Sequence, residues 1–595
     1  MRNPNRKMYH LPLQAVWGGM VVGAIMAGLI LFLSNDTLGL GGTVLLLGWL
    51  LFFYVMLFSL LSLGGACLWR LIWDWPRGEW LVPLFLIAVS VIYTWNFYLY
   101  RLFLRPIQKL VLIFEVVLFL IFSFWTWWGK NDQGGEISKN SGRYLLFLCF
   151  LIIVVNGSLT SVTNRVPRVQ TIDFKAAPNT PLYVFGLDGA DWKIMWPYHK
   201  MGKIAVLSRL IRNGSRHQLE TYDPTSSPLI WTTIVTGKDP FQHGIRDFGL
   251  YRLHPTAQYI SVLPKGAGFS KIAALAKKLG LWEFYPSSSL QNRCPPIWDI
   301  ASEQGLSVTV NNWPVSIPVS AVKGIISGET GYYSFHNLKP EGRFFPELIE
   351  NELNESKTQL VVTPPDKTLT LDDDVRLALQ IEDHMVGQWS SYRYGLKKWP
   401  ALLTMVYTHS LDLFQHLFWR FGYRESHNIS PEKIALASRM IENHIIRLDQ
   451  QLGPFYESLP FQPYTLILSD HGFRTIYFFE KWTHPQSERV QGVHDFSPAG
   501  FFLAHGPGIR RNQAGPVFSI FDIMPTLLHL LGLPTAQDMR GSSLVTVLLD
   551  NETPNPERPP PINTYQVRQK QQSWPRNKDE DSHIETKLKS LGYIE

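Results

Sequence analysis

Acidic residues and histidines stand beside apolar runs at four places in the chain. They are Asp188, Asp412, His416, Asp470, His471 and His494. Asp412 and His416 are four positions apart, which places their side chains on one face of a helix. Such a pair is common by chance, whereas an Asp-His dipeptide directly after an apolar strand is unusual in a plain core. Carboxylates and imidazoles are ligands of divalent metal ions, so the set as a whole predicts a centre for two such ions.

A hydroxyl-rich turn that leads into an apolar helix at 223–236 offers a nucleophile. Ser227 is our candidate, with Thr225 and Ser226 as alternatives one or two positions away. A helix N-terminus presents backbone N–H groups and a positive dipole end to a phosphoryl oxygen. A metal ion nearby would favour loss of the serine proton. Ordinary capping of the helix by these hydroxyls is the alternative explanation of the turn.

Apolar strands that end in polar residues alternate with helical stretches in the same part of the chain. Strands are expected at 182–188, 401–407 and 464–470, and helices at 271–279, 374–393 and 431–452. The alternation predicts an α/β fold with a mostly parallel sheet between layers of helices. Sites in such sheets form at the carboxyl ends of strands, so Asp188 and Asp470 should lie on the same edge.

The N-terminal part has a different composition, with long apolar runs that carry almost no charge. Five runs are long enough to cross a bilayer, at 14–34, 43–66, 80–100, 110–128 and 144–162. We therefore expect a transmembrane domain at 1–165, a linker at 166–180, a catalytic domain at 181–550, and a polar tail with a short terminal helix at 551–595.

The Lys and Arg residues between these runs predict an orientation. With a cytoplasmic N-terminus, the tail and the second and fourth loops carry eight basic residues, against three in the third loop. The positive-inside rule then places the catalytic domain outside the cytoplasm and makes the lipid bilayer its first partner. The formal net charge is +7, but the basic residues are scattered, which argues against a nucleic-acid partner. The sequence indicates no particular oligomeric state.

The helix after Ser227 carries three short motifs: Trp231-Thr-Thr, Thr236-Gly237 and Pro240-x-x-His243-Gly244-Ile245. This run resembles the nucleophile segment of the type I phosphodiesterase/nucleotide pyrophosphatase family in the alkaline phosphatase superfamily. The resemblance continues over about 181–549, in the motifs Pro296-Ile-Trp298, Asn312-Trp-Pro314, Ser469-Asp470-His471-Gly472 and Asp522-Ile-Met-Pro525. It implies an alkaline phosphatase-like sheet sandwiched by helices, and it does not extend to the N-terminal runs.

The family pattern, carried over by position, implies a division of the ligands between two ions. Asp412, His416 and His494 would hold one ion, and Asp188, Asp470 and His471 the other, with Ser227 near both. Zn²⁺ suits mixed imidazole and carboxylate ligands, and Mn²⁺ tolerates the same set.

One position departs from the family pattern. Nucleotide pyrophosphatases have an Asn three residues after the nucleophile, where this chain has Ile230. That change argues against assuming a nucleotide substrate. Asn312 and His409 are candidates to replace the missing phosphate donor.

These observations predict a membrane-anchored, metal-dependent phosphodiesterase or phosphotransferase that acts through a phospho-Ser intermediate. Proximity to the bilayer favours lipid head groups or lipid-linked phosphates as substrates. A catalytically degenerate membrane sensor that kept the fold is the alternative from another class. A sulfatase-type hydrolase is a lesser one, because Ser226-x-Pro228 resembles the sulfatase nucleophile motif but Ile230 stands where that motif has Arg.

Overall fold

The computed structural model describes most of the catalytic domain expected from the sequence. The described residues are 30, 46, 49–50, 180–256, 258–261, 269–329, 342–349, 371–422, 431–457, 462–475, 492–494, 496–553 and 559–565. The five expected membrane spans, apart from isolated positions, and the expected terminal helix lie outside these residues. Within the described part, no helix combines the length and the apolar character that crossing a bilayer requires.

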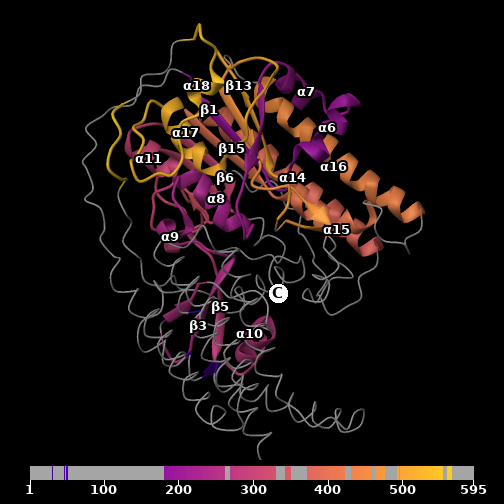
Figure 1. Cartoon of the computed structure of the whole chain (residues 1–595), viewed down its shortest axis with the longest axis vertical. Helices are drawn as coiled ribbons and strands as arrows, with labels where there is room; N and C mark the ends of the chain where they lie inside the picture. Colours follow the sequence, from indigo (N-terminus) through magenta and orange to yellow (C-terminus); the bar gives the residue numbers. More distant parts are fainter. Residues whose placement is uncertain are drawn as a thin grey trace, which may run out of the picture. The chain divides into compact units, whose positions relative to one another are not determined.

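A ten-stranded sheet forms the centre of the main unit, in the order β14-β2-β13-β10-β1-β9-β6-β7-β8, with β15 beside β2 (Figure 1). Its strands are β1 (Leu182–Leu187), β2 (Ser215–Glu220), β6 (Val308–Trp313), β7 (Gly324–Gly328), β8 (Phe344–Phe345), β9 (Leu403–Thr408), β10 (Tyr464–Leu468), β13 (Gly500–His505), β14 (Gln513–Ala514) and β15 (Phe518–Ser519). The strands β10, β1, β9, β6 and β7 run parallel to their neighbours within this group, and β13 and β8 are antiparallel. The mostly parallel sheet predicted from the sequence is confirmed.

The central strands are buried along their whole length because helices cover both faces of the sheet. Every residue of β1, β6, β9, β10 and β13 is buried. This explains why these strands appear in the sequence as continuous apolar runs rather than as an alternation of apolar and polar residues.

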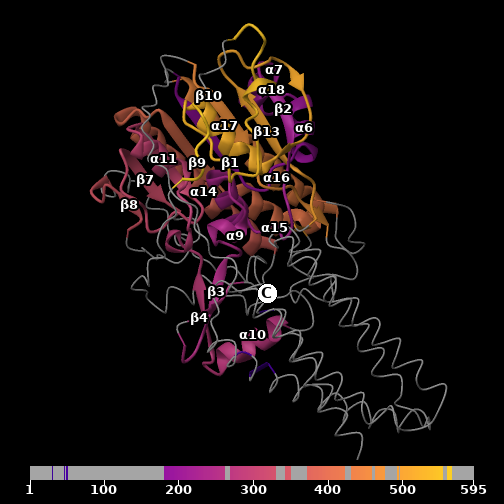
Figure 2. The ribbon, with the colours of Figure 1, turned by 60° about the vertical axis from the view of Figure 1, so that its left-hand side comes forward.

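Two groups of helices flank the sheet (Figures 1 and 2). One group contains α6 (Trp192–Lys200), α7 (Ala205–Arg212), α14 (Leu371–Lys398), α15 (Ser410–Gly422) and α16 (Pro431–Glu457). The other contains α8 (Ser227–Thr236), α9 (Pro240–His243), α11 (Ile297–Glu303), α17 (Ile523–Leu530) and α18 (Val545–Leu548). All ten residues of α8 are buried, so this helix is part of the core and not a surface element.

The ends of α8 follow from local sequence. Pro228 lies in its first turn, where a missing N–H costs no helical hydrogen bond. Gly237 ends the helix in a left-handed conformation with φ 66°, and its N–H donates to the carbonyl of Thr233. Asp239 then begins α9 as part of a capping box with Gln242. The predicted apolar helix after the hydroxyl-rich turn is therefore present.

A second compact unit includes residues 249–285. It contains a three-stranded sheet in the order β4-β3-β5, formed by β3 (Gly249–Leu253), β4 (Gln258–Ile260) and β5 (Trp282–Pro286), and the helix α10 (Phe269–Lys278). The sequence had grouped the stretch 271–279 with the helices of the large sheet, whereas the structure assigns it to this smaller unit.

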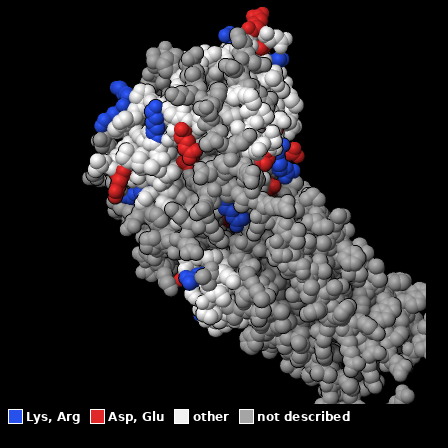
Figure 3. Space-filling view, turned by 90° about the vertical axis from the view of Figure 1, so that its left-hand side faces the viewer, with Lys and Arg blue, Asp and Glu red and all other residues white. Residues whose placement is uncertain are grey.

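The described part of the polar tail, 559–565, lies in extended form against the main unit. Ile562 forms a parallel bridge with Ala536, and the hydroxyl of Thr564 donates to Asp538, 2.8 Å away. Asp538 also forms an ion pair with the buried Lys238, which follows α8. On the face shown in Figure 3, the acidic and basic side chains of the described residues are interspersed.

Candidate active site

The candidate residues meet where parallel strands end. Asp188 directly follows β1, and its N–H donates to the carbonyl of Thr408 at the end of the neighbouring β9. The helix α15, which carries Asp412, begins two residues after β9 at Ser410. Asp470 follows β10 on the other side of β1. Parallel pairing brings these carboxyl ends to one edge, as the sequence predicted.

A cluster of fully buried ionisable groups lies at this edge. The Nε2 atom of His471 is 3.2 Å from Oδ1 of Asp188 and 3.4 Å from Oδ2 of Asp470. Ligand atoms of Asp188, Asp412 and His471 all lie within 4.8 Å of one another. These four side chains are 0 % exposed. Burying several carboxylates together is costly unless a cation compensates them, so the donor set fits a divalent metal ion.

The remaining two histidines lie beside this cluster. Nε2 of His416 is 3.6 Å from Oδ2 of Asp412, as expected for residues on one helix face. The ring of His494 stacks on that of His471 at 4.5 Å between centroids and lies 5.5 Å from that of His416. All six residues predicted as ligands are thus brought together. Asp412 lies close to His416, its expected partner at one ion, and also to Asp188 and His471, which were expected to hold the other ion.

Burial and the neighbouring charges shift the pKa values of the side chains in the cluster. Burial would lower the pKa of His471, but the charges of Asp470 and Asp188 raise it to about 10. Burial would raise the pKa of Asp188, but His471 holds it well below its usual range. Burial and the charge of Asp188 raise the pKa of Asp470. For His416, burial and the charge of His471 lower the pKa to about 3, which leaves a neutral ring that can serve as a ligand.

Side chains outside the cluster fix the loop that carries His471. The hydroxyl of Ser469 accepts the N–H of Ala190 at 2.9 Å and donates to the carbonyl of His471 at 3.0 Å. Asp191 accepts the N–H of Ile194 at 2.8 Å as the N-cap of α6, and also the N–H of Phe473 at 3.4 Å. These two residues therefore tie the loop after β10 to the loop after β1.

The loop after β1 is also held from α15. Gly189 adopts a left-handed conformation with φ 73°, and its carbonyl accepts a 2.6 Å hydrogen bond from the side chain of Gln415. No role was predicted from the sequence for Asp191, Gln415 or Ser469, although Ser469 is part of the motif Ser469-Asp470-His471-Gly472. The signal of Asp191 and Gln415 was position, since each stands within three residues of a predicted ligand.

The candidate nucleophile occupies the first position of α8. The hydroxyl of Ser227 is buried and has no hydrogen-bond partner among the described residues. In contrast, Oγ1 of Thr225 donates to Asp223 at 3.2 Å, and Oγ of Ser226 donates to Asp247 at 3.4 Å. Ser226 is the N-cap of α8 but its side chain makes no capping hydrogen bond, so simple capping does not explain this turn.

A tryptophan connects α8 to the cluster. Nε1 of Trp231 donates to Oδ2 of Asp188 at 3.1 Å. Trp231 is four residues after Ser227, so both side chains lie on the same face of the helix. The face of α8 that carries Ser227 is therefore the face that contacts Asp188. Ile230, three residues after Ser227, is 0 % exposed.

Both candidate phosphate donors also lie at the carboxyl ends of strands. Asn312 has φ 57° at an irregularity in the pairing of β6 with β7, and its amide donates to the carbonyl of Tyr407 at 3.4 Å. His409 lies between β9 and α15, is buried, and its ring is parallel to that of Tyr407 at 6.2 Å. Positive φ in a residue other than glycine is sparsely populated and clusters at functional sites.

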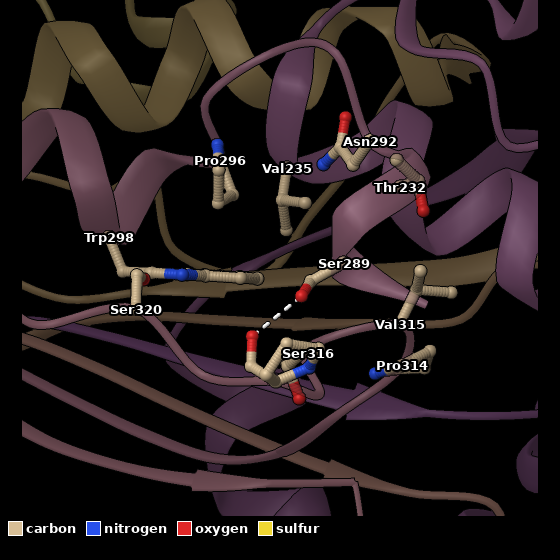
Figure 4. Close-up of a pocket in the computed structure, with 11 residues that line it drawn as sticks. Thr232, Val235, Ser289, Asn292, Pro296, Trp298, Pro314, Val315, Ser316 and Ser320 are labelled. Atoms are coloured by element: carbon tan, nitrogen blue, oxygen red, sulfur yellow. Dashed lines mark hydrogen bonds between the residues drawn. The ribbon is translucent and has the colours of Figure 1, made fainter. Parts of the chain in front are cut away.

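A small pocket lies next to Thr232 and Val235 of α8 (Figure 4). The hydroxyl of Thr232 donates to the carbonyl of Pro228, and that of Ser289 donates to the carbonyl of Pro318. No predicted ligand or nucleophile lines this pocket. It is therefore separate from the cluster in residues and in chemistry.

A buried centre of carboxylates and imidazoles lies at the edge of a mostly parallel sheet and is joined to α8 through Trp231. Such a centre is typical of metal-dependent hydrolases. Residues 182–500, more than half of the chain, match the model of the family "Type I phosphodiesterase / nucleotide pyrophosphatase". The chain belongs to that family and is a metal-dependent phosphoric ester hydrolase. No curated protein sequence matches the chain.

Solved structures with partial similarity include two of ectonucleotide pyrophosphatase/phosphodiesterase 5. An inactive variant of the murine protein, in complex with AMP, is 17 % identical and has a TM-score of 0.35, covering 62 % of this chain and 100 % of that chain. The human protein is 16 % identical and has a TM-score of 0.33, with the same coverage of both chains. At TM-scores this low, the likeness bears on neither substrate nor mechanism.

Proposed function

We propose that the chain is a two-metal phosphodiesterase or phosphotransferase in which Ser227 is the nucleophile. The observation that carries this proposal is the buried Ser227 hydroxyl, which has no hydrogen-bond partner among the described residues. Ser227 also shares a helix face with Trp231, whose Nε1 donates a hydrogen bond to the Asp188 carboxylate. The hydroxyls of Thr225 and Ser226 are engaged with carboxylates, which supports Ser227 over both alternatives.

The proposed ligands divide as the family pattern implies. Asp412, His416 and His494 would hold one ion, and Asp188, Asp470 and His471 the other. Bound there, the ions supply positive charge that favours loss of the Ser227 proton and stabilises the oxygens of the transferring phosphoryl group. Zn²⁺ suits this ligand set, and Mn²⁺ is the alternative.

The reaction then proceeds in two displacements. In the first, Oγ of Ser227 forms a bond to phosphorus as the bond from phosphorus to the leaving oxygen breaks, which leaves a phospho-Ser. N–H groups in the first turn of α8, those of Ser227 and Leu229, can donate to phosphoryl oxygens, whereas Pro228 has none. In the second, the acceptor oxygen forms a bond to phosphorus as the bond from phosphorus to Oγ of Ser227 breaks, and the proton that the acceptor loses restores the Ser227 hydroxyl. Water as acceptor gives hydrolysis, and an alcohol gives transfer.

We further propose that residues 1–165 anchor this domain to a membrane by five spans and place it on the extracytoplasmic side. The support is the length of the apolar runs and the distribution of Lys and Arg around them. A bilayer next to the site favours lipid head groups or lipid-linked phosphates as substrates. Ile230 at the position of the family's Asn makes a nucleotide the weaker candidate.

Release of p-nitrophenol from mono- and diester substrates tests this function. Ser227→Ala removes one hydroxyl and is expected to abolish turnover while the protein retains its metal and its fold. Ser226→Ala and Thr225→Ala are matched controls, since each also removes one hydroxyl from the same turn. Wild-type turnover by Ser227→Ala, or loss of turnover in a control instead, contradicts the assignment.

A further inference from the structure

The two oxygens of Asp188 have different surroundings. Oδ1 faces the cluster, 3.2 Å from Nε2 of His471. Oδ2 accepts two hydrogen bonds, one of 2.6 Å from the hydroxyl of Tyr407 and one of 3.1 Å from Nε1 of Trp231. Two donors on Oδ2 occupy the lone pairs that a metal ion would otherwise use. Asp188 therefore presents one oxygen, Oδ1, to the cluster.

A glycine makes room for both donors. Gly186 is on β1, two residues before Asp188, which directly follows the strand. The two positions therefore face the same side of the sheet. A Cβ atom at Gly186 would lie 2.9 Å from two ring atoms of Trp231 and 3.2 Å from a ring atom of Tyr407. Gly186 is also the direct partner of Tyr407 in the pairing of β1 with β9. The absence of a side chain there lets both rings stand over β1 and reach Asp188.

The two rings form one rigid group. Trp231 and Tyr407 are 0 % exposed, and their rings meet edge to face with centroids 5.1 Å apart. Their positions in the chain differ, however, because Tyr407 belongs to β9 and Trp231 belongs to the helix that begins with Ser227. The bond from Trp231 therefore fixes the nucleophile's helix relative to Asp188, whereas the bond from Tyr407 fixes only Asp188.

We infer that Tyr407 and Trp231 are positioning residues that limit Asp188 to one metal-binding oxygen, and that Trp231 in addition aligns Ser227 with the ion held there. The inference rests on the proposed function. Partners that orient a ligand typically change metal affinity by about 10- to 100-fold when removed. Both residues should share this effect, and only Trp231 should also act on the step that Ser227 performs.

Metal affinity is the first measurement, made on the full chain in detergent with Zn²⁺ and a competing chromophoric chelator. Tyr407→Phe and Trp231→Phe are each expected to weaken one bound ion by about 10- to 100-fold. Trp313→Phe is the matched control, since Trp313 is fully buried with its ring 5.3 Å from that of Trp231, and its Nε1 makes no hydrogen bond to a described residue. It should keep the affinity of the wild type.

The rate of Ser227 phosphorylation in a single turnover, at saturating Zn²⁺, is the second measurement. Trp231→Phe should remain slow when both ions are bound, whereas Tyr407→Phe should recover the wild-type rate. Gly186→Ala displaces both rings without removing a donor and should reproduce the loss of affinity. Tyr407→Phe removes a single oxygen atom and is the variant expected to disturb folding least.

The outcomes separate this inference from the function on which it rests. Wild-type affinity in both Tyr407→Phe and Trp231→Phe overturns the positioning role, and equal single-turnover rates in the two variants overturn the alignment by Trp231. A wild-type protein that binds no Zn²⁺ or cleaves no phosphate ester overturns the proposed function itself.

Discussion

Replacement of Gly472 by alanine tests whether the loop after β10 is held as the structure indicates. A Cβ atom at Gly472 would lie 2.3 Å from Oδ2, 2.9 Å from Cβ and 3.0 Å from Cγ of Asp191. Asp191 cannot turn away freely, because its carboxylate caps α6 through Ile194 and accepts the N–H of Phe473. Either the capping bond or the loop must shift.

The expected cost follows from these two options. Overpacking of a close contact costs about 1–3 kcal/mol, and loss of an N-cap costs ~1 kcal/mol. Gly472→Ala should therefore lower the free energy of unfolding by about 2–4 kcal/mol. Because Gly472 follows His471, movement of the loop also displaces a proposed ligand, and a displacement of ~1 Å can lower the rate by about 100-fold.

Unfolding in denaturant and turnover of a p-nitrophenyl ester measure the two effects. Asp191→Ala removes Oδ2 and Cγ, two of the three atoms in the contact, and also the cap. The double variant Asp191→Ala/Gly472→Ala should therefore lose less stability than the sum of the single variants. Additive losses would show that the contact does not limit the loop. Wild-type stability and turnover in Gly472→Ala would refute the reasoning altogether.

Three further results are expected. Metal analysis of His416→Ala and His471→Ala should find about one bound ion in each variant instead of two, because the two histidines are assigned to different ions. Two bound ions in both variants would show that the six residues do not form the proposed metal centre. A topology reporter after Glu595 should report an extracytoplasmic position and one within 131–142 a cytoplasmic position, so matching signals would contradict five spans. Burial, and to a lesser extent the charge of a nearby arginine, holds the pKa of His243 well below its usual range. At a pH just below ~6.5 the ring is therefore neutral in the folded protein but protonated in the unfolded chain. Stability should thus fall as pH drops below ~6.5, by up to about 1.4 kcal/mol per pH unit for this group, and unfolding curves of His243→Gln should lack that contribution.

The sequence by itself determined the placement of the chemistry along the chain. Apolar runs that end at Asp188 and Asp470 predicted parallel strands, and parallel strands must bring their carboxyl ends together. The four-residue spacing of Asp412 and His416 set a common helix face. These inferences succeed because they depend on local periodicity, which a short stretch of sequence contains in full.

Other features depended on contacts between distant segments, and only the tertiary structure decided them. The link from Asp191 to the loop at Phe473 joins residues 282 positions apart, and no local pattern marks it. The smaller unit at 249–285 interrupts the main one, and its helix resembles in sequence the helices that cover the large sheet. Amphipathic periodicity indicates that a helix has a buried face but not which sheet buries it.

The surroundings of Asp188 show the same division most clearly. The sequence identified Asp188 as a ligand and Trp231 as a motif residue, but it gave no reason to connect them or to single out Gly186. Their contact depends on the register that pairs Gly186 with Tyr407, and a shift of one residue would turn Tyr407 to the opposite face of the sheet. Register is a property of two strands together, so the folded sheet, and not either segment alone, decided which oxygen of Asp188 faces the cluster.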